Sequence, residues 1–382
     1  MSIVLNEGID QVVKKDILAL NDKIQEFNAG KVSDEKFRSY RLARGVYGQR
    51  QLGVQMIRIK LPYGRLNSEQ MIRIADVCDE FASGVMHATT RQDIQIHHVK
   101  LAHTPQLWAK LEEKNITLRE ACGNTVRNVT GSADAGINPN ELFDITPYAH
   151  AFFKYFLRNP ICQEMGRKFK VAFSSDETDN AFTYIHDLGF IPKIQNNERG
   201  FKVVVGGGLG AQPFHAFVYS EFMHVDDFIP FSEAVIRVFD RYGERTRRHK
   251  ARLKYLISDL GFDAFIALVE EERIAIKNKK FVVDPHDFTA SVIPAENGIQ
   301  IISLQDEKKF QAWLKTNVHK QKQEGFFSIN VKLPLGNMDT DTARALAELV
   351  AEGYSADEFR ITVNQGYLIK FVREQYLRYF FQ

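Results

Sequence analysis

Cysteine is scarce in this sequence, which has only three among 382 residues: Cys78, Cys122 and Cys162. The three lie far apart and none belongs to a CxxC pair, so the sequence offers no closely spaced thiolate ligands for a metal. Ordinary buried thiols are the default interpretation. Because disulfide pairing is not indicated, we expect a reducing cytoplasm as the location.

Long apolar runs are also missing. No stretch of 18 consecutive apolar residues occurs, so we expect no transmembrane helix and no membrane partner. The first residues, "MSIVLNEGIDQVVKK", lack the basic start and apolar centre of a signal peptide. Charge is balanced, with 50 basic and 48 acidic residues, which gives no reason to expect a nucleic-acid partner.

The chain is long and apolar enough for two or three packed domains, with 44% hydrophobic residues. Residues 5–42 have a helical pattern, and residues 231–272 have a strongly helical one. The patterns divide the chain into four parts: an N-terminal helical segment (1–44), a first ferredoxin-like repeat (45–117), a mixed α/β domain (118–300) and a second ferredoxin-like repeat (301–382).

An internal repeat is the strongest pattern. "IRIKLPYG" (57–64) returns as "INVKLPLG" (329–336), and "ATTRQDIQIHHV" (88–99) returns as "ITVNQGYLIKFV" (361–372) at nearly the same displacement. A capped helical pattern lies between the two motifs in each copy, which gives the strand–helix–strand order of a ferredoxin-like half. A period this long indicates a duplicated domain rather than a solenoid.

The segment "TTRQDIQIHHV" alternates with period two when it is read as one strand. One predicted face has an apolar centre at Ile94 and Ile96, and His98 follows beside the core. The other face carries Arg91, Asp93, Gln95, His97 and Val99. The second copy has uncharged or different residues at the matching positions, namely Asn330 for Arg58, Asn364 for Arg91, Gly366 for Asp93, Leu368 for Gln95 and Lys370 for His97. This asymmetry favours a binding site on the first copy over ordinary solvation.

Two further motifs bring cations. In "RKFKVAFSS", Lys168 and Lys170 share one predicted strand face, which lowers at least one ammonium pKa and favours an anion site. An exposed face with two ordinary lysines is the alternative. Arg127 in "VRNVTGS" suits anionic oxygens, although an exposed loop arginine has the same appearance. The basic run Arg245–Lys254 is predicted to be a solvated helix face rather than a phosphate site.

The glycine-rich stretch "VVVGGGLGA" formally fits GxGxxA, but the helix and acidic residue of a dinucleotide fold do not follow it. Glycines here instead favour close approach of the backbone to a flat ligand or another strand, and a tight turn remains the simple alternative.

In this order, the duplicated unit, "VRNVTGS", "RKFK" and "VVVGGGLG" resemble the sulfite/nitrite reductase haemoproteins over about residues 45–382. The resemblance implies an α+β fold in which duplicated ferredoxin-like half-domains flank a mixed α/β haemoprotein domain. It also implies two cofactors, sirohaem and a [4Fe–4S] cluster.

The resemblance assigns roles to residues that the patterns already singled out. It implies contact with a small anionic substrate for Arg58, Arg127, Lys168 and Lys170. It implies sirohaem contact for Arg91, Gln95 and His97, and weaker cofactor contact for Gly206, Gly207 and Gly208. None of these residues is expected to bind a metal.

One departure concerns the cluster, which the family binds through four cysteines spaced CxxxxxC…CxxxC after the second repeat. This sequence has no such spacing. We therefore expect an N-terminal portion or half of a split enzyme, with the cluster ligands beyond residue 382 and no turnover by this chain alone.

The function that the resemblance implies is the six-electron reduction of sulfite to sulfide. Lys170 favours sulfite, because ferredoxin-dependent nitrite reductases of the family tend to have Asn there; reduction of nitrite to ammonia is the alternative. Ferredoxin or a separate flavoprotein is the expected electron donor, since no flavin or NADPH domain is visible. The alternative from another class is a non-catalytic module that binds a tetrapyrrole or RNA.

Overall fold

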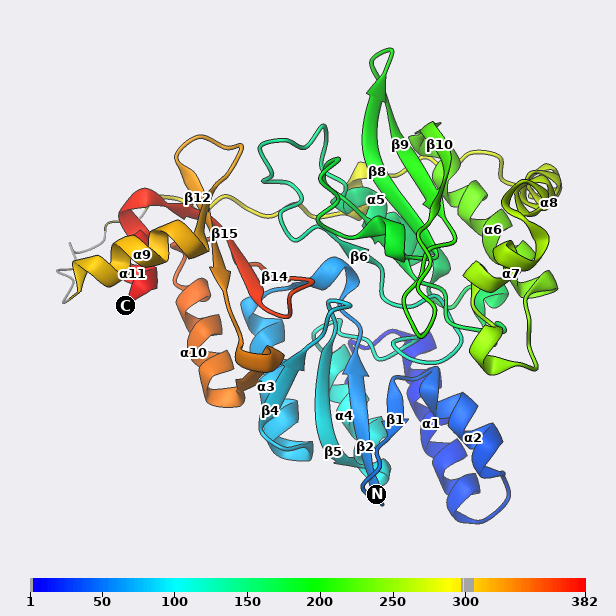
Figure 1. Cartoon of the computed structure of the whole chain (residues 1–382). Helices are drawn as coiled ribbons and strands as arrows, with labels where there is room; N and C mark the ends of the chain where they lie inside the picture. Colours follow the sequence, from blue (N-terminus) through cyan, green and yellow to red (C-terminus); the bar gives the residue numbers. More distant parts are fainter. Residues whose placement is uncertain (1–2, 297, 299–305) are drawn as a thin grey trace.

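The structure is a computed structural model that describes residues 3–296, 298 and 306–382. It contains three five-stranded sheets, each with helices packed against it (Figure 1). Within the described residues, no helix is both long and apolar enough to cross a membrane. The fold is α+β, as the sequence predicted.

The first sheet is built mainly from the first copy of the repeat. Its strands in spatial order are β1 (Val46–Gly48), β2 (Val54–Ile59), β5 (Ile94–Lys100), β4 (Val85–Ala88) and β13 (Asn337–Asp339). The helices that follow β2 and β5 are α3 (Ser68–Phe81) and α4 (Thr104–Glu112). Asn67 caps α3 in a capping box with Gln70, which confirms the predicted start of this helix.

The sheet of the second copy has the same plan. Its strands are β11 (Val318–Lys320), β12 (Phe326–Val331), β15 (Tyr367–Arg373), β14 (Phe359–Ile361) and β3 (Arg65–Leu66). Its helices are α9 (Glu307–Asn317), α10 (Thr340–Ala351) and α11 (Leu377–Phe381). The two copies therefore exchange edge strands, because β3 of the first copy pairs with β14 and β13 of the second pairs with β4.

Helices α3 and α10 lie side by side, and one continuous apolar core joins the two copies (Figure 1). Ile74 on α3 and Ala347 on α10 are both fully buried in this core. Burial of apolar surface from both copies in a shared core stabilises them as one unit.

The third sheet belongs to the segment between the copies. Its strands are β10 (Phe217–His224), β9 (Glu198–Val205), β8 (Leu188–Gln195), β7 (Val171–Phe173) and β6 (Thr130–Gly131). The strands from β6 to β8 are parallel, whereas β8, β9 and β10 are antiparallel. The helices of this region are α5 (Thr146–Phe156), α6 (Phe228–Tyr242), α7 (Leu253–Leu260) and α8 (Phe262–Ala275). Stacked and edge-on rings, including Phe173 and Phe190, fill its core.

Both regions with a helical pattern contain more than one helix. The N-terminal segment forms two helices, α1 (Gln11–Asn28) and α2 (Asp34–Leu42), which Asp10 and Ser33 cap at their starts. The helical pattern over 231–272 is likewise divided into α6, α7 and α8. Gly261, with a φ of 87°, separates the last two helices, because this backbone conformation suits glycine.

The strand predicted across "TTRQDIQIHHV" is shorter than expected and contains a bulge. Residues 89–93 form a turn between β4 and β5, so Arg91 lies in a turn and not in a strand. At His98 the φ angle is +67° and the pairing with β2 shifts by one residue. Val99 is therefore buried and His98 exposed, the reverse of the predicted alternation. The second copy has the same bulge, with a φ of +59° at Phe371.

Candidate functional site

The first sheet lies next to the sheet of the central segment (Figure 1). The predicted cations of the two parts interact there, because the charge of Arg58 acts on Arg127, that of Arg127 on Lys168 and that of Arg91 on Lys170. Strand β2 supplies Arg58, and the turn between β4 and β5 supplies Arg91. The segments that lead into β6 and β7 supply Arg127 and the two lysines. Asn128 joins these parts, because its side-chain amide donates to the carbonyls of Leu61 at 2.6 Å and Arg91 at 3.1 Å.

Arg58 is held from one side by the neighbouring strand. It pairs in register with Gln95. With its amide oriented to satisfy both groups, Gln95 accepts hydrogen bonds from Arg58 Nη2 at 2.6 Å and Nε at 3.1 Å. Asp93 Oδ2 lies 4.0 Å from Arg58 Nε. The guanidinium is thus oriented by an amide and a carboxylate while part of it remains accessible.

Arg91 is directed toward the central segment. Its guanidinium donates to the carbonyl of Asn128 and to Thr130 Oγ1. Burial lowers its pKa to about 10, against the raising effect of Asp93, so it stays charged at neutral pH. Its Nε atom is buried without a hydrogen-bond partner among the described residues. A buried, unpaired N–H of this kind is a donor that a bound anionic group would satisfy.

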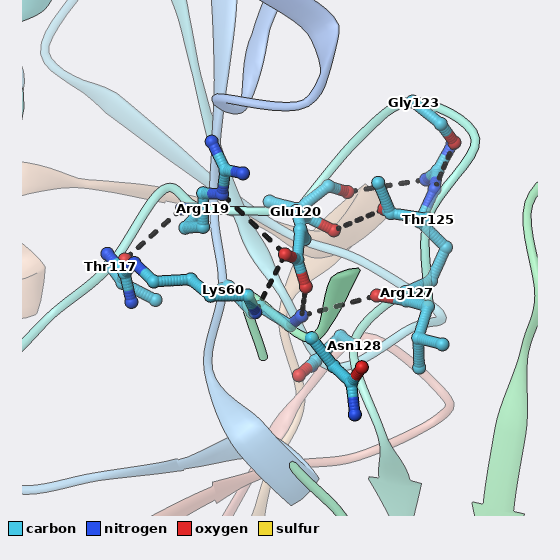
Figure 2. Close-up of polar contacts among 12 residues, drawn as sticks. Lys60, Thr117, Arg119, Glu120, Gly123, Thr125, Arg127 and Asn128 are labelled. Atoms are coloured by element: carbon cyan, nitrogen blue, oxygen red, sulfur yellow. Dashed lines mark hydrogen bonds and ion pairs between the residues drawn. The ribbon is translucent and has the colours of Figure 1, made fainter. Parts of the chain in front are cut away.

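Arg127 is fixed by the backbone of the loop before it (Figure 2). Its Nε donates to the Gly123 carbonyl at 2.9 Å and its Nη1 to the Ala121 carbonyl at 3.3 Å. Burial lowers its pKa to about 10. The sequence left open an exposed loop arginine, and the structure excludes that alternative.

The same loop contains Glu120, a buried carboxylate that the sequence did not single out. It accepts hydrogen bonds from the Arg158 backbone N–H at 2.9 Å and from Gln163 Nε2 at 2.8 Å. The second oxygen of Glu120 faces Lys60 Nζ at 3.9 Å (Figure 2). Burial lowers the pKa of Lys60, and Glu120 opposes that change. This ion pair connects the loop of Arg127 to the end of β2.

Lys168 and Lys170 enter the same region in the extended segment before β7. Burial, followed by the charge of Arg127, lowers the pKa of Lys168 to about 8. Burial, followed by the charges of Arg91 and Arg252, lowers the pKa of Lys170 to about 6. Both side chains are half-buried, so they are not two fully exposed lysines. Within the described residues, neither ammonium group has a hydrogen-bond or ion-pair partner.

Sequence reasoning missed one ion pair beside these lysines. Arg252 Nη2 lies 2.7 Å from Asp187 Oδ2, and Asp187 is fully buried. The same carboxylate accepts the Lys170 backbone N–H at 2.9 Å, so it fixes the segment that carries the lysine. Arg252 belongs to the basic run predicted to be solvated, and no local pattern marked it as buried. The start of that run, with Arg247, is indeed exposed.

Two histidines border the site. His186, which the sequence analysis did not single out, is buried, and its Nδ1 lies 2.7 Å from the Phe182 carbonyl oxygen. Burial and the charge of Arg91 hold its pKa well below the usual value, so it is neutral. His97 is half-buried, and its ring centroid lies 6.5 Å from that of His87. Burial also lowers the pKa of His97, and its predicted contact with a cofactor stays a prediction.

The glycine-rich stretch packs against the protein itself. An added Cβ at Gly207 would lie 2.2 Å from the Tyr184 carbonyl oxygen, and Gly206 has a φ of +90°. Gly208 lies beside Arg252, 3.2 Å from Nη2 by the same measure. Close packing of the chain thus explains Gly206 and Gly207, and their predicted cofactor contact stays untested. The antiparallel neighbours of β9 are not those of a dinucleotide-binding unit.

The second copy has no comparable set of cations at the equivalent positions. Asn330, Asn364 and Leu368 instead line a cavity of about 320 Å³ between β12, β15 and the central segment. The two copies share a backbone plan, but only the first has arginines at the positions of Arg58 and Arg91.

The three cysteines do not form a metal site. All are buried, and burial raises the pKa of Cys78 to about 11 and that of Cys162 still further. Over the described range, no group of three or more His, Cys, Asp or Glu side chains has the arrangement of a metal site. Thiols with raised pKa values are poor thiolate ligands.

Comparison with protein families gives two matches. Residues 122–277 match the nitrite and sulphite reductase 4Fe-4S domain. Residues 47–114 and 319–382 match the nitrite/sulfite reductase ferredoxin-like half domain. The chain belongs to the nitrite and sulfite reductase family. The two half-domain matches also confirm the duplication that the sequence repeat predicted.

Among curated relatives, the chain is 29% identical to a chloroplastic ferredoxin–nitrite reductase of Oryza sativa subsp. japonica, over 98% of this chain and 60% of the relative. It is 27% identical to a ferredoxin sulfite reductase of Mycolicibacterium paratuberculosis, over 82% of this chain and 52% of the relative. The chain thus spans little more than half the length of these family members. The structure of the Mycobacterium tuberculosis NirA protein has the same fold, with a TM-score of 0.77 and 24% identity over 96% of this chain and 67% of that one.

Proposed function

We propose that this chain forms the sirohaem- and anion-binding part of a sulfite reductase, with nitrite as the alternative substrate. The observation that carries the proposal is the convergence of Lys168 and Lys170, two half-buried lysines without partners among the described residues, on Arg58, Arg91 and Arg127. Cationic groups gathered in this way lower the pKa values of the lysines among them, and a bound anion would relieve that repulsion. A structural role alone would not favour such an arrangement.

The residues present suit a sirohaem, whose carboxylates require several cations directed one way. We propose that Arg91 binds such a carboxylate through its unpaired Nε, with His97 and Gln95 at the same edge. When it is bound, sirohaem supplies the electrons to the substrate. The glycines 206–208 remain weaker candidates for its other edge.

The lysines have a role in proton supply. Lys170, with a pKa of about 6, is mostly neutral at pH 7 in the protein without ligand. An anion bound beside it raises that pKa, so the lysine takes up a proton as the substrate arrives. Removal of substrate oxygen as water consumes protons, and Lys170 and Lys168 are placed to donate them. Arg58 and Arg127 bind the anion and stabilise its developing charge.

A [4Fe–4S] cluster does not fit the described residues, because the three cysteines are buried and separate, and burial raises the pKa values of Cys78 and Cys162. We propose that its ligands come from outside residues 1–382 and that ferredoxin or a separate flavoprotein delivers electrons there. On this proposal the chain binds sirohaem and anion but does not turn over by itself. The cytoplasmic location stays a prediction.

The test uses the complete protein, purified from cells that make sirohaem and supplied with a reduced dye. We expect sirohaem absorption and sulfite- or nitrite-dependent oxidation of the dye. Absence of both contradicts the proposal. Tight RNA binding with a steep dependence on salt would instead favour the non-catalytic module.

The choice between substrates rests on Lys170. The Lys170→Asn variant should shift preference toward nitrite while sirohaem occupancy stays unchanged. Loss of sirohaem from this variant would show that Lys170 contacts the macrocycle rather than the substrate. Lys168→Asn is the matched control, because it removes a neighbouring cation with a smaller pKa shift.

A further inference from the structure

Asp93 is a carboxylate enclosed by the cations of the site. Its side chain is 2% exposed, and Oδ2 lies 4.0 Å from Arg58 Nε. Its other oxygen, Oδ1, is buried without a hydrogen-bond partner in the part of the chain that the structure describes. An unsatisfied buried carboxylate oxygen is costly, so its presence calls for a reason other than stability.

The second copy shows that the fold does not require this carboxylate. The turn of Asp93 is closed by two bonds: the Thr89 N–H donates to the Asp93 carbonyl at 2.9 Å, and the Asp93 N–H donates to Thr89 Oγ1 at 3.1 Å. In the second copy, Thr362 and Gly366 make both bonds, at 2.9 Å and 3.1 Å. Glycine at the same position therefore forms the same turn.

The carboxylate accompanies the arginines. The first copy has Arg58, Arg91 and Asp93, whereas the second has Asn330, Asn364 and Gly366. The negative group is thus present in the copy that carries the site and absent from the copy that does not. This pairing connects Asp93 to the chemistry of the site rather than to the backbone.

We propose that Asp93 is a positioning residue that orients Arg58 toward the bound anion and, by gaining or losing a proton, sets how strongly the site attracts that anion. The inference rests on the proposed anion-binding function. When ionised, Asp93 holds Arg58 and cancels one positive charge of the site. When protonated, it leaves that charge available to the anion.

Burial and the neighbouring cations set the pH range in which Asp93 gains or loses its proton. Burial raises the Asp93 pKa to about 6, although Arg58, Arg91, Lys60 and Arg127 all lower it. Arg91 and Arg127, each with a pKa of about 10, stay charged throughout that range. Lys170, with a pKa of about 6, titrates there as well, so a substitution at Asp93 removes only part of the total pH dependence.

The first experiment measures binding of nitrite, which stays ionised from pH 5 to pH 8, to the full chain by calorimetry. We expect the wild-type affinity for nitrite to fall about tenfold from pH 5 to pH 7.5. This corresponds to a change of about one unit in the pKa of Asp93 when nitrite binds. In Asp93→Asn the fall should be clearly smaller, and binding at pH 7.5 should be several-fold tighter than in the wild type. Asp341→Asn, at a side chain that is 99% exposed, is the control for net charge and should match the wild type.

The second experiment observes Arg58 without any anion. The Nε–H signal of Arg58 in NMR spectra, assigned with Arg58→Lys, should shift with a midpoint near pH 6 in the wild type and lose that shift in Asp93→Asn. If the asparagine variant does not fold, Asp93→Gly replaces it, since the second copy accommodates glycine in this turn.

The two experiments separate the possible failures. If nitrite does not bind but the Arg58 signal follows Asp93, the proposed function is wrong and the positioning of Arg58 stands. If the Arg58 signal is independent of pH near 6, or if wild type and Asp93→Asn bind nitrite with the same pH profile, the inference about Asp93 is overturned.

Discussion

Gln92 and Gln365 occupy the same position in the two copies, and each donates its amide to a backbone carbonyl of the other copy. Gln92 Nε2 donates to the Ile361 carbonyl at 2.8 Å, and Gln365 Nε2 donates to the Ala88 carbonyl at 2.9 Å. Both residues have a positive φ, 58° and 64°. This glutamine, which both copies share, therefore holds the copies together. The candidate site, in contrast, consists largely of residues that differ between them.

Gln92 should contribute more to stability than Gln365. Gln92 is fully buried and also exchanges two hydrogen bonds with the backbone of Gly131. We expect Gln92→Ala to lower the free energy of unfolding by about 3 kcal/mol, since it leaves several buried groups unpaired. Urea unfolding measures this, with Gln365→Ala as the matched variant. A larger loss in Gln365→Ala would contradict the assignment.

Lys170 should destabilise the protein without ligand. Its pKa is lower in the folded than in the unfolded chain, so the unfolded chain binds the extra proton between about pH 6 and the ordinary lysine range. The loss in free energy of unfolding that Lys170 causes is therefore complete below pH 6 and disappears as pH rises toward 10. Lys170→Met should therefore raise the free energy of unfolding at pH 7 by about 3 kcal/mol, and by much less at pH 10.

Unfolding curves at several pH values check this prediction. Lys308→Met, at an exposed position of α9, is the control and should have no comparable pH-dependent effect. Equal stabilisation by Lys170→Met at pH 7 and pH 10 would show that hydrophobic gain, and not the buried charge, is responsible.

Arg58→Asn converts the first copy to the residue of the second. We expect nitrite or sulfite affinity at pH 7 to fall at least about tenfold, because a charge-assisted contact with an anion contributes about 1.5–3 kcal/mol. Calorimetric titration measures the change. Asn330→Ala in the second copy is the matched control and should bind like the wild type. Unchanged affinity in Arg58→Asn would exclude this arginine from the anion site.

Gly207→Ala tests whether the glycine-rich stretch serves packing. Because the added methyl would lie 2.2 Å from the Tyr184 carbonyl oxygen, we expect a loss of about 2–3 kcal/mol of stability in the protein without cofactor. Gly8→Ala, whose methyl would lie 3.6 Å from the side-chain oxygen of Asn6, is the control. A variant with normal stability but impaired sirohaem binding would favour the cofactor role instead.

The sequence predicted the duplication, the α+β class and the group of cations, because each follows from periodicity or from residues that differ between the copies. It did not predict the bulge at His98. Histidine adopts a positive φ more often than most residues, but one histidine does not mark a bulge, and the equivalent Phe371 is not of an enriched type. One extra residue there exchanges the faces of His98 and Val99.

The parts of the site that the sequence missed depend on long-range contacts. Asp187 meets Arg252 across 65 positions, and only the folded chain brings the acid to the base. Glu120 lies in a loop without regular periodicity, where its partners come from two separate segments, Lys60 from the end of β2 and Arg158 and Gln163 from the connection after α5. Local patterns contain no information about such pairs.

The exchange of β3 and β13 has a consequence for the origin of the chain. Each sheet is completed by a strand from the other copy, so neither copy on its own has a fully paired sheet edge. Two identical halves joined in this way would form a symmetric, strand-swapped dimer with two equivalent sites. In one chain the two sites can differ, and here one carries the arginines and a carboxylate while its twin carries asparagines and a glycine.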